Sequence, residues 1–218
     1  MTTQTLPLKS IEFFPFISQI FYINLDKRSD RRFEIEQELQ HFDFPQNIVT
    51  RFAAIEELHG LGFIGCSKSH LAILRLAQER NYENIIIFED DFKFIISKEL
   101  LFSNLHEFFS KHREKFDVLM LSYNLHESEP IDDLIGYCRK AQTASGYIVN
   151  KRIYSELIAT MEIALEKLIE THQHWLYMND VCWFSLQKTK EWYYLMDRAG
   201  IQRASFSDLA NKMVDYQV

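Results

Sequence analysis

The stretch that decides the fold is NIIIFEDDFKF, residues 84–94. Four consecutive apolar residues, 85–88, run directly into the carboxylates Glu89, Asp90 and Asp91. A short, unbroken apolar run rich in β-branched residues predicts a strand that is buried on both faces of a sheet. Three adjacent carboxylates repel one another and are costly to desolvate. The triplet therefore either binds a cation at the end of the strand or forms a solvated, charged turn.

Further strands and helices alternate on both sides of this stretch. The segments that predict strands are QIFYINL (19–25), NIVTRFAAI (47–55), DVLMLSY (117–123) and ASGYIVN (144–150). Helices are predicted from Ser29 as N-cap, from about Ser67 after a glycine-containing loop, over 101–112, and after Asn150 as N-cap. Residues 124–142 show no clear periodicity and predict a mobile loop, and the tail from Ala210 is expected to fray. The pattern predicts an α/β fold with a mostly parallel sheet flanked by helices.

Composition restricts the class of protein further. With 218 residues and 47% hydrophobic content, the chain is expected to form one domain over residues 1–218. The net charge of −7 and the absence of a long Lys/Arg block argue against nucleic acid as a partner. Cys66, Cys138 and Cys182 are far apart and show neither CxxC nor Cys/His zinc spacing, so no disulfide framework and no thiolate zinc site is expected.

The expected location follows from the absence of targeting and membrane signals. The N-terminal segment has no basic region and no signal-peptidase pattern, and no apolar run approaches the length of a membrane span. Free thiols in a reducing cytoplasm are the simplest interpretation. A peripheral association with the inner face of a membrane stays open.

Polar residues follow two predicted strands at the edge where α/β sheets collect ligands. After the first strand come Arg28, Arg31 and Arg32, near a helix N-terminus that favours anions, while Asn24 and Asp26 could hydrogen-bond ribose hydroxyls or a base edge. Solvated arginines at the start of an amphipathic helix are the alternative. After NIIIF, alternation would put Glu89 and Asp91 on one side as ligands of a divalent cation and Asp90 on the other.

Two other segments offer chemistry. In GCSKSHLA, Ser67, Ser69 and His70 could hold a phosphate or a sugar hydroxyl, although a lone histidine is more often a satisfied core residue beside an ordinary cap. A Cys66–His70 nucleophile pair is conceivable, but Cys66 fits better as a small core residue. Asp180 lies in an aromatic segment, WLYMNDVCWF, where burial could raise its pKa for general-base work; a helix cap is the alternative.

The ordered set of motifs resembles glycosyltransferase family 25. The segments that carry the resemblance are FYINLDKRSDRR, GCSKSHLAILRLAQERNYENIIIFEDD, ASGYIVNKRIYSELI, the position of Asp180 and IQRASFSDL, which together span about residues 19–209. The resemblance implies a GT-A fold with a DXD-like motif that normally uses Mn²⁺, or Mg²⁺, and a UDP-sugar donor. It also implies an inverting transfer of a hexose, above all galactose or glucose, to a surface glycan or lipooligosaccharide.

Carried over by position, the resemblance assigns roles to individual residues. Asp91 and Glu89 fall at the metal motif, and Asp180 at an acidic position that we interpret as the catalytic base. The nucleotide-sugar segment contains Asn24, Asp26, Arg28, Arg32, Ser67, His70 and Asp90. Two other classes stay open: a metal-dependent phosphohydrolase, although EDDFKF lacks the hydroxyl residue expected after its nucleophile, and a non-catalytic glycan-binding module.

Overall fold

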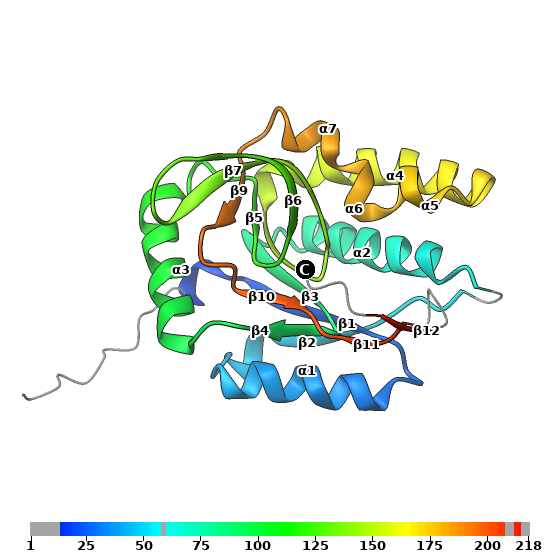
Figure 1. Ribbon diagram of the computed structural model, residues 1–218, viewed down its shortest axis with the longest axis horizontal. Coiled ribbons are helices and arrows are strands. Elements are labelled where there is room, and N and C mark those ends of the chain that lie inside the picture. The colour runs from blue at the N-terminus through cyan, green and yellow to red at the C-terminus, as the bar shows by residue number, and fades with distance from the viewer. Residues whose placement is uncertain (1–13, 58–59, 208–211, 215–218) are drawn as a thin grey trace, which may run out of the picture.

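An eight-stranded sheet forms the middle layer of the protein (Figure 1). The computed structural model describes residues 14–57, 60–207 and 212–214. Across the sheet the strand order is β2-β1-β3-β8-β5-β9-β7-β6. The strands are β1 Gln19–Asn24, β2 Val49–Ala53, β3 Asn84–Glu89, β5 Val118–Met120, β6 Asn124–Pro130, β7 Ile135–Gln142, β8 Gly146–Asn150 and β9 Trp192–Leu195.

Most of the strands run in the same direction. β1 pairs in parallel with both β2 and β3, and β5 pairs in parallel with β9. β8 is antiparallel to β3 and β5, and β7 is antiparallel to β9 and β6, so these two strands oppose the others. The predicted α/β fold with a mostly parallel sheet is thus confirmed, with two reversed strands that the sequence did not reveal.

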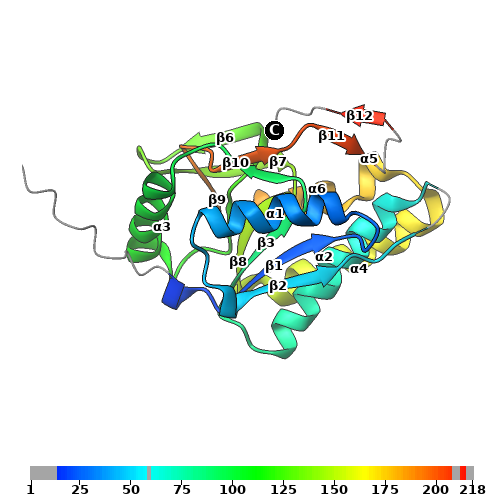
Figure 2. The same ribbon diagram turned by 90° about the horizontal axis from the view of Figure 1, so that it is seen from below.

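Helices cover both faces of the sheet (Figures 1 and 2). α1 Ser29–His41 and α3 Lys98–His112 pack on one face, and α2 Gly62–Glu79 and α4 Tyr154–Thr171 on the other. Three short helices follow α4: α5 His174–Tyr177, α6 Asn179–Cys182 and α7 Phe184–Gln187. Single 3-10 turns lie at Phe14–Phe16, Gln46–Ile48 and Lys151–Ile153. No helix in the described ranges is long and apolar enough to cross a membrane.

The alternation of side chains along β3 explains why two helical layers are needed. Ile86 and Phe88 belong to the core on the α1–α3 face, whereas Ile85 and Ile87 belong to the core on the α2–α4 face. All four side chains are fully buried. A strand that is apolar on both faces is stable only between two layers of helices, which is the arrangement that NIIIF predicts.

Two small sheets complete the architecture. β4 Phe92–Phe94 pairs with β10 Gly200–Gln202, and β11 Ser205–Ser207 pairs with β12 Lys212–Val214. The first of these pairs attaches the chain after β9 to the turn that follows β3. It therefore places a late segment of the sequence directly beside the three carboxylates.

The prediction of a mobile loop over residues 124–142 is wrong. These residues form the hairpin β6–β7, and Asp132 closes its turn by accepting the N–H groups of Leu134 and Ile135 at 2.9 Å each. β6 is the outermost strand and is largely exposed, so its sequence lacks the apolar pattern by which strands are recognised.

Two helix starts also differ from the prediction. α2 begins at Gly62 rather than near Ser67. Its first turn packs against the main chain of Ile55, and a glycine makes this possible, since a Cβ on Gly65 would lie 2.2 Å from the Ile55 carbonyl oxygen. Ser29 is the first residue of α1, and Arg28 occupies the N-cap position. The predicted cap at Asn150 is confirmed for the 3-10 turn Lys151–Ile153, since its side chain accepts the N–H of Arg152 at 2.9 Å, whereas the N-cap position of α4 itself is held by Ile153. Ala210 lies outside the described residues.

Candidate active site

The polar residues predicted from the sequence gather where β1 and β3 end. β1 ends at Asn24 and β3 at Glu89, and the two strands are parallel neighbours, so both carboxyl ends reach the same edge of the sheet. Asp90 and Asp91 form the turn between β3 and β4. This edge is where open α/β sheets bind their ligands.

Close packing around Phe92 fixes the position of that turn. The ring is fully buried, and a Cβ on Gly146 or on Gly200 would lie 2.4 Å or 2.2 Å from its atoms. Only glycine leaves room for the ring at either position. Phe92 therefore anchors the chain immediately after Asp91, and the main-chain N–H of Arg203 donates to the Asp91 carbonyl oxygen at 2.6 Å.

One side of the turn is a network of Arg31 with two carboxylates. Arg31 Nη1 lies 3.0 Å from Asp90 Oδ1 and 3.3 Å from Asp91 Oδ2. The amide of Asn24, 1% exposed, donates to Asp90 Oδ2 at 2.7 Å and accepts from Arg51 Nε at 3.1 Å. A guanidinium between two buried carboxylates offsets part of their repulsion.

Asp91 is incompletely satisfied within this network. Its Oδ2 atom receives Arg31 and, at 3.5 Å, the amide of Gln202, whereas Oδ1 is buried and has no hydrogen-bond partner among the described residues. Burial, together with the negative charge of Glu89, raises the pKa of Asp91 to about 8 despite the opposing effect of Arg31. A buried carboxylate oxygen without a donor fits a hard divalent cation, which binds such oxygens directly.

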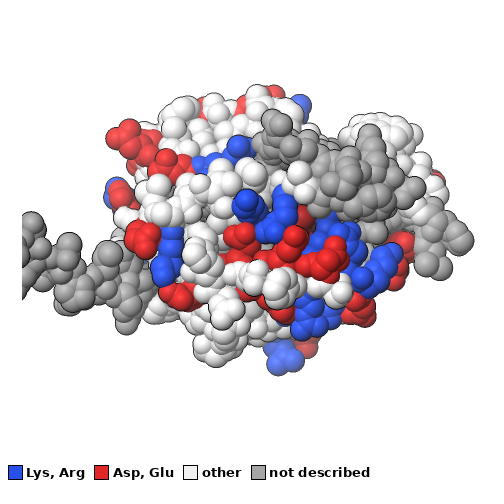
Figure 3. Space-filling model, turned by 60° about the horizontal axis from the view of Figure 1, so that its bottom comes forward, with Lys and Arg blue, Asp and Glu red and all other residues white. Residues whose placement is uncertain are grey.

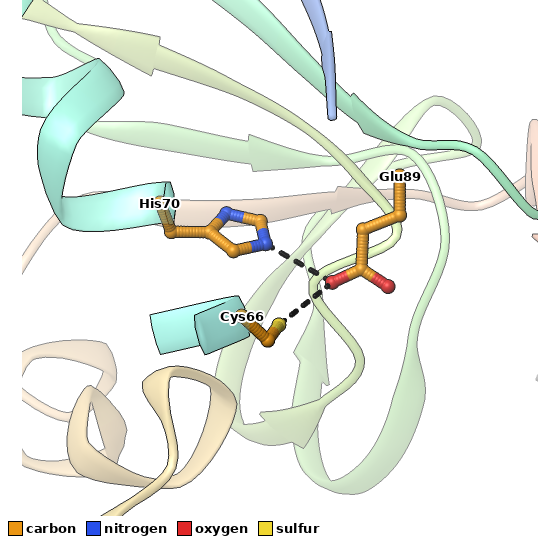
Figure 4. Close-up of side chains that lie close together, drawn as sticks. All are labelled: Cys66, His70 and Glu89. Carbon is orange, nitrogen blue, oxygen red and sulfur yellow. Dashed lines mark hydrogen bonds and ion pairs between the residues drawn. The ribbon is translucent and has the colours of Figure 1, made fainter. Parts of the chain in front are cut away.

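The other side of the turn is a cluster around Glu89 (Figure 4). His70 Nε2 lies 3.0 Å from Glu89 Oε1, and Cys66 Sγ lies 3.7 Å from the same oxygen. His70 Nδ1 lies 2.8 Å from the hydroxyl of Tyr147 on β8. Figure 4 shows both α2 side chains pointing toward Glu89, whose second carboxylate oxygen is directed away from them.

These contacts determine the electrostatics of the cluster. Burial alone would raise the pKa of Glu89, but the hydrogen bond and the charge of His70 outweigh it, so the pKa lies below the ordinary value. Burial and the adjacent Glu89 carboxylate raise the pKa of the Cys66 thiol well above its ordinary value. Cys66 is therefore protonated at neutral pH, which argues against the Cys66–His70 nucleophile pair.

Asp180 lies beside this cluster, in the first turn of α6. Burial, aided by the charge of Glu89, raises its pKa, while the N–H of Thr143, which donates to Asp180 Oδ2 at 3.1 Å, acts in the opposite direction. Thr143 has a φ of +84°, a conformation that β-branched residues rarely adopt. Strain of this kind is typical of functional sites, and here it aims a backbone donor at Asp180.

A family model matches the part of the chain that contains most of these site residues. Residues 54–182 match the model described as "Glycosyltransferase family 25 (LPS biosynthesis protein)", a range that includes Cys66, His70, the Glu89–Asp91 turn and Asp180. The chain belongs to glycosyltransferase family 25. No curated protein matches the sequence.

Two solved structures are similar to this family 25 protein at low sequence identity. A glycosyltransferase involved in the glycosylation of the major capsid of PBCV-1 has a TM-score of 0.51 and 10% identity, over 88% of this chain and 95% of the other. A mannose-1-phosphate geranyltransferase from Thermus thermophilus has a TM-score of 0.47 and 12% identity, over 89% and 76% of the two chains. The first of these supports the predicted GT-A-like fold.

In the family 25 chain, some of the predicted nucleotide-sugar residues lie beside the turn and others lie farther from it. Asn24 and Asp90 lie in the buried network, and His70 lies in the Glu89 cluster. Ser67 is buried beside α6, with its hydroxyl 3.4 Å from Asn179 Oδ1.

The remaining predicted residues lie in ion pairs farther out. Asp26 pairs with Arg51 at 2.5 Å, Arg28 with Asp30 at 2.8 Å, and Arg32 with Glu36 at 2.9 Å. Figure 3 shows how acidic and basic side chains interleave on this side of the molecule. Arg31, to which the family resemblance assigned no role, is the arginine of this segment that contacts the carboxylates of the turn.

Other residues of the family 25 site give little or no signal in the sequence. Arg51 lies on β2 and reaches Asn24, and Arg203 pairs with Glu34 and Glu38 of α1 at 3.1 and 2.9 Å. Tyr147 could have been noticed as the tyrosine of the ASGYIVN strand. Nothing local to Arg51 or Arg203 marks them, because their partners are distant in sequence.

Proposed function

We propose that this family 25 glycosyltransferase is a metal-dependent, inverting enzyme that moves a hexose, galactose or glucose first, from a UDP-sugar to a hydroxyl group. The acceptor is a surface glycan or a lipooligosaccharide. The observation that carries the proposal is the buried Asp91 Oδ1 atom, which has no hydrogen-bond donor among the described residues. It lies just beyond the end of β3, where Arg31 of α1 contacts the other oxygen of the same carboxylate. Such an atom suits a cation that is shared with a diphosphate.

Asp91 and Glu89 would hold the metal, Mn²⁺ or Mg²⁺. When bound, the metal supplies positive charge that stabilises the diphosphate as it leaves. The donor set fits, because both carboxylates offer hard oxygen ligands and Glu89 directs one oxygen away from His70 and Cys66 (Figure 4). Arg31 contributes a fixed positive charge to the same place, and we add it to the nucleotide-sugar residues.

The proposed donor site extends from the Arg31 network to the start of α2. It comprises Asn24, Asp26, Arg28, Arg31, Arg32, Ser67, His70 and Asp90. The buried members hold the turn and the carboxylates in place before the donor arrives, which lowers the cost of binding. The exposed ion pairs of Asp26, Arg28 and Arg32 must open before those side chains can contact a nucleotide.

Asp180 is the proposed base. Its ionised carboxylate takes the proton of the acceptor hydroxyl, whose oxygen forms a bond to the anomeric carbon while the bond from that carbon to the diphosphate oxygen breaks. A single displacement of this kind inverts the anomeric configuration. Burial raises the pKa of Asp180 and so makes its carboxylate a stronger base than an exposed aspartate. The N–H of Thr143 orients the carboxylate by donating to its Oδ2 atom.

The test is incubation of the full chain with Mn²⁺ and a panel of UDP- and GDP-sugars, with release of free nucleotide and thermal stabilisation as the two readouts. UDP with Mn²⁺ is expected to stabilise the protein, and Asp91→Ala is expected to lose that stabilisation. Asp133→Ala is the matched control, because Asp133 is exposed in the β6–β7 turn. Binding of UDP that does not depend on a metal, or the absence of binding by every nucleotide sugar, would contradict the proposal.

We further propose that the enzyme works in the cytoplasm, at the inner face of a membrane when the acceptor is a glycolipid. The description of the family as an LPS biosynthesis protein supports a glycolipid acceptor. Transfer to a lipooligosaccharide acceptor in detergent, but not to free monosaccharides, would support this part of the proposal.

A further inference from the structure

The Cys66 thiol, which has no role in the proposed sugar transfer, lies together with the His70 imidazole and the Glu89 carboxylate in one set of ligand atoms. Cys66 and His70 are one helical turn apart on α2 and therefore project from the same face of the helix. Glu89 reaches the same point from the end of β3. The sequence could not indicate this set, because its third member is distant along the chain and the spacing of Cys66 and His70 matches no common zinc motif.

The ligand atoms already lie at distances typical of one metal ion. Cys66 Sγ, His70 Nε2 and a Glu89 carboxylate oxygen are all within 4.8 Å of one another. The sulfur lies 3.7 Å from Glu89 Oε1, and the nitrogen lies 3.0 Å from the same oxygen. With ordinary zinc bond lengths, a tetrahedral site has edges of about 3.3–3.7 Å between such atoms. Shifts of a few tenths of an ångström would bring these two pairs to tetrahedral geometry.

The surroundings support His70 as a ligand. Its Nδ1 atom is 2.8 Å from the Tyr147 hydroxyl, and its ring is fully buried and stacks on the tyrosine ring. Metal-binding imidazoles are usually oriented in this way by a hydrogen bond at the second nitrogen. With the proton on Nδ1 donated to the Tyr147 oxygen, the lone pair of Nε2 points toward Glu89.

We infer that Cys66, His70 and Glu89 form a binding site for Zn²⁺, with a fourth position left for water. The ligand types favour Zn²⁺ over Mn²⁺, because a thiolate and an imidazole are softer than the oxygen ligands that Mn²⁺ prefers, and Zn²⁺ binds such ligands more tightly. Binding forms sulfur–zinc and nitrogen–zinc bonds and releases to solvent the thiol proton of Cys66 and the proton on His70 Nε2, while Nδ1 keeps its proton.

Zinc at this site would also regulate the enzyme, a consequence that rests on the proposed function. Glu89 belongs to both the zinc set and the proposed site for Mn²⁺ or Mg²⁺. Zinc at Cys66 and His70 would take one oxygen of Glu89 and place a second positive charge beside Asp91. Zn²⁺ would then inhibit the Mn²⁺-dependent enzyme. The zinc set itself stands on the geometry of these three residues, whichever donor the enzyme uses.

Cobalt substitution tests the inference without reference to activity. The full, reduced chain is titrated with Co²⁺, and the expected result is a thiolate-to-cobalt charge-transfer band together with visible bands typical of tetrahedral Co²⁺, at one ion per chain. Zn²⁺ is expected to remove these bands by displacement. Cys66→Ser should abolish the charge-transfer band and weaken Zn²⁺ binding by at least about tenfold.

Two controls make the result decisive. Cys182→Ser removes another partly buried thiol, at the end of α6, and should retain the cobalt spectrum. Asp91→Asn should also retain it while losing stabilisation by UDP and Mn²⁺, so failure of the zinc inference and failure of the proposed function give different results. Melting without metal verifies that each variant is folded. A charge-transfer band that survives Cys66→Ser, or Zn²⁺ binding of equal strength in that variant, would overturn the inference.

Discussion

Glu89 and Asp91 are carboxylates of the same turn, yet their surroundings shift their pKa values in opposite directions. Asp91 is buried and Glu89 is half-buried, and this removal from water by itself raises the pKa of each. For Glu89, the hydrogen bond and charge of His70 outweigh burial, whereas for Asp91 the charge of Glu89 adds to burial and Arg31 opposes them incompletely. The difference shows that α2 stabilises the charge of Glu89, while Asp91 keeps an oxygen atom for a partner that the described part of the chain does not supply.

Asp180 adds a third carboxylate to this comparison, and its substitution is expected to have the largest effect on transfer. Asp180→Asn keeps the shape and removes the base, so the rate of sugar transfer should fall by about 10²–10⁴-fold. Binding of UDP with Mn²⁺, followed by thermal shift, should persist, because Asp180 lies outside the proposed metal and nucleotide contacts. Transfer at the normal rate would contradict the assignment of Asp180 as the base; a role as N-cap of α6 is not the alternative, because Met178 holds that position.

Removal of the cation between Asp90 and Asp91 should have the next largest effect. Arg31→Met retains much of the side-chain volume but leaves two buried carboxylates without their ion pair, and this should lower the free energy of unfolding by about 3–5 kcal/mol. Denaturant unfolding at pH 9 measures the change, because this pH lies above the pKa of about 8 of Asp91 and the carboxylate is ionised there. Arg32→Met is the matched control, since the exposed Arg32–Glu36 pair should contribute little to stability. Equal losses in the two variants would contradict the network described for Arg31.

The raised pKa of Asp91 predicts how the stability of the metal-free protein depends on pH. The unfolded aspartate loses its proton near pH 4, whereas the folded one keeps it up to about pH 8. Between these values the folded state binds more protons, so this group lowers stability as pH rises from about 4 to 8. The melting temperature of Asp91→Asn should decline less than that of the wild type over this interval. Parallel curves for the two proteins would contradict the assignment.

Glu89→Gln should have a smaller effect with the opposite dependence on pH. The pKa of Glu89 is lowered in the folded state, so its charge stabilises the fold above the unfolded pKa, and this stabilisation is lost as pH falls through the folded pKa. At pH 7 the substitution should cost about 1–3 kcal/mol, because the charged acceptor of His70 is lost. The cost should shrink in acid, as urea unfolding at pH 7 and below pH 4 would show. A cost that grows in acid would contradict the lowered pKa of Glu89.

The sequence predicted the centre of the fold better than its edge. Continuous apolar strands such as NIIIF carry the information for a sheet covered on both faces, and Glu89, Asp90 and Asp91 lie at the sheet edge that was expected. Alternation does not continue beyond Glu89, however, because the strand ends there and the turn brings Asp90 and Asp91 to the same arginine. The side of the turn on which Asp90 lies could therefore not be read from strand periodicity.

The arginine that contacts the turn could not be chosen from the sequence either. Arg28, Arg31 and Arg32 are close in sequence, but helix geometry turns successive side chains by about 100°, so neighbours face different directions. Which of them meets the carboxylates depends on how α1 is rotated against the sheet. That rotation is set by Ile35 and Leu39, which are buried in the core, and is a property of tertiary packing.

The hairpin that the sequence concealed has a consequence for behaviour in concentrated solution. A free strand at the rim of a sheet is a template for pairing with another chain, and this is a route to aggregation. β6 carries Glu127 and Glu129, shifts register twice against β7, and ends at Pro130. Charge, irregular spacing and a missing N–H group each oppose the addition of a further strand. The acidic composition that hides β6 from pattern recognition thus also protects this side of the protein from self-association.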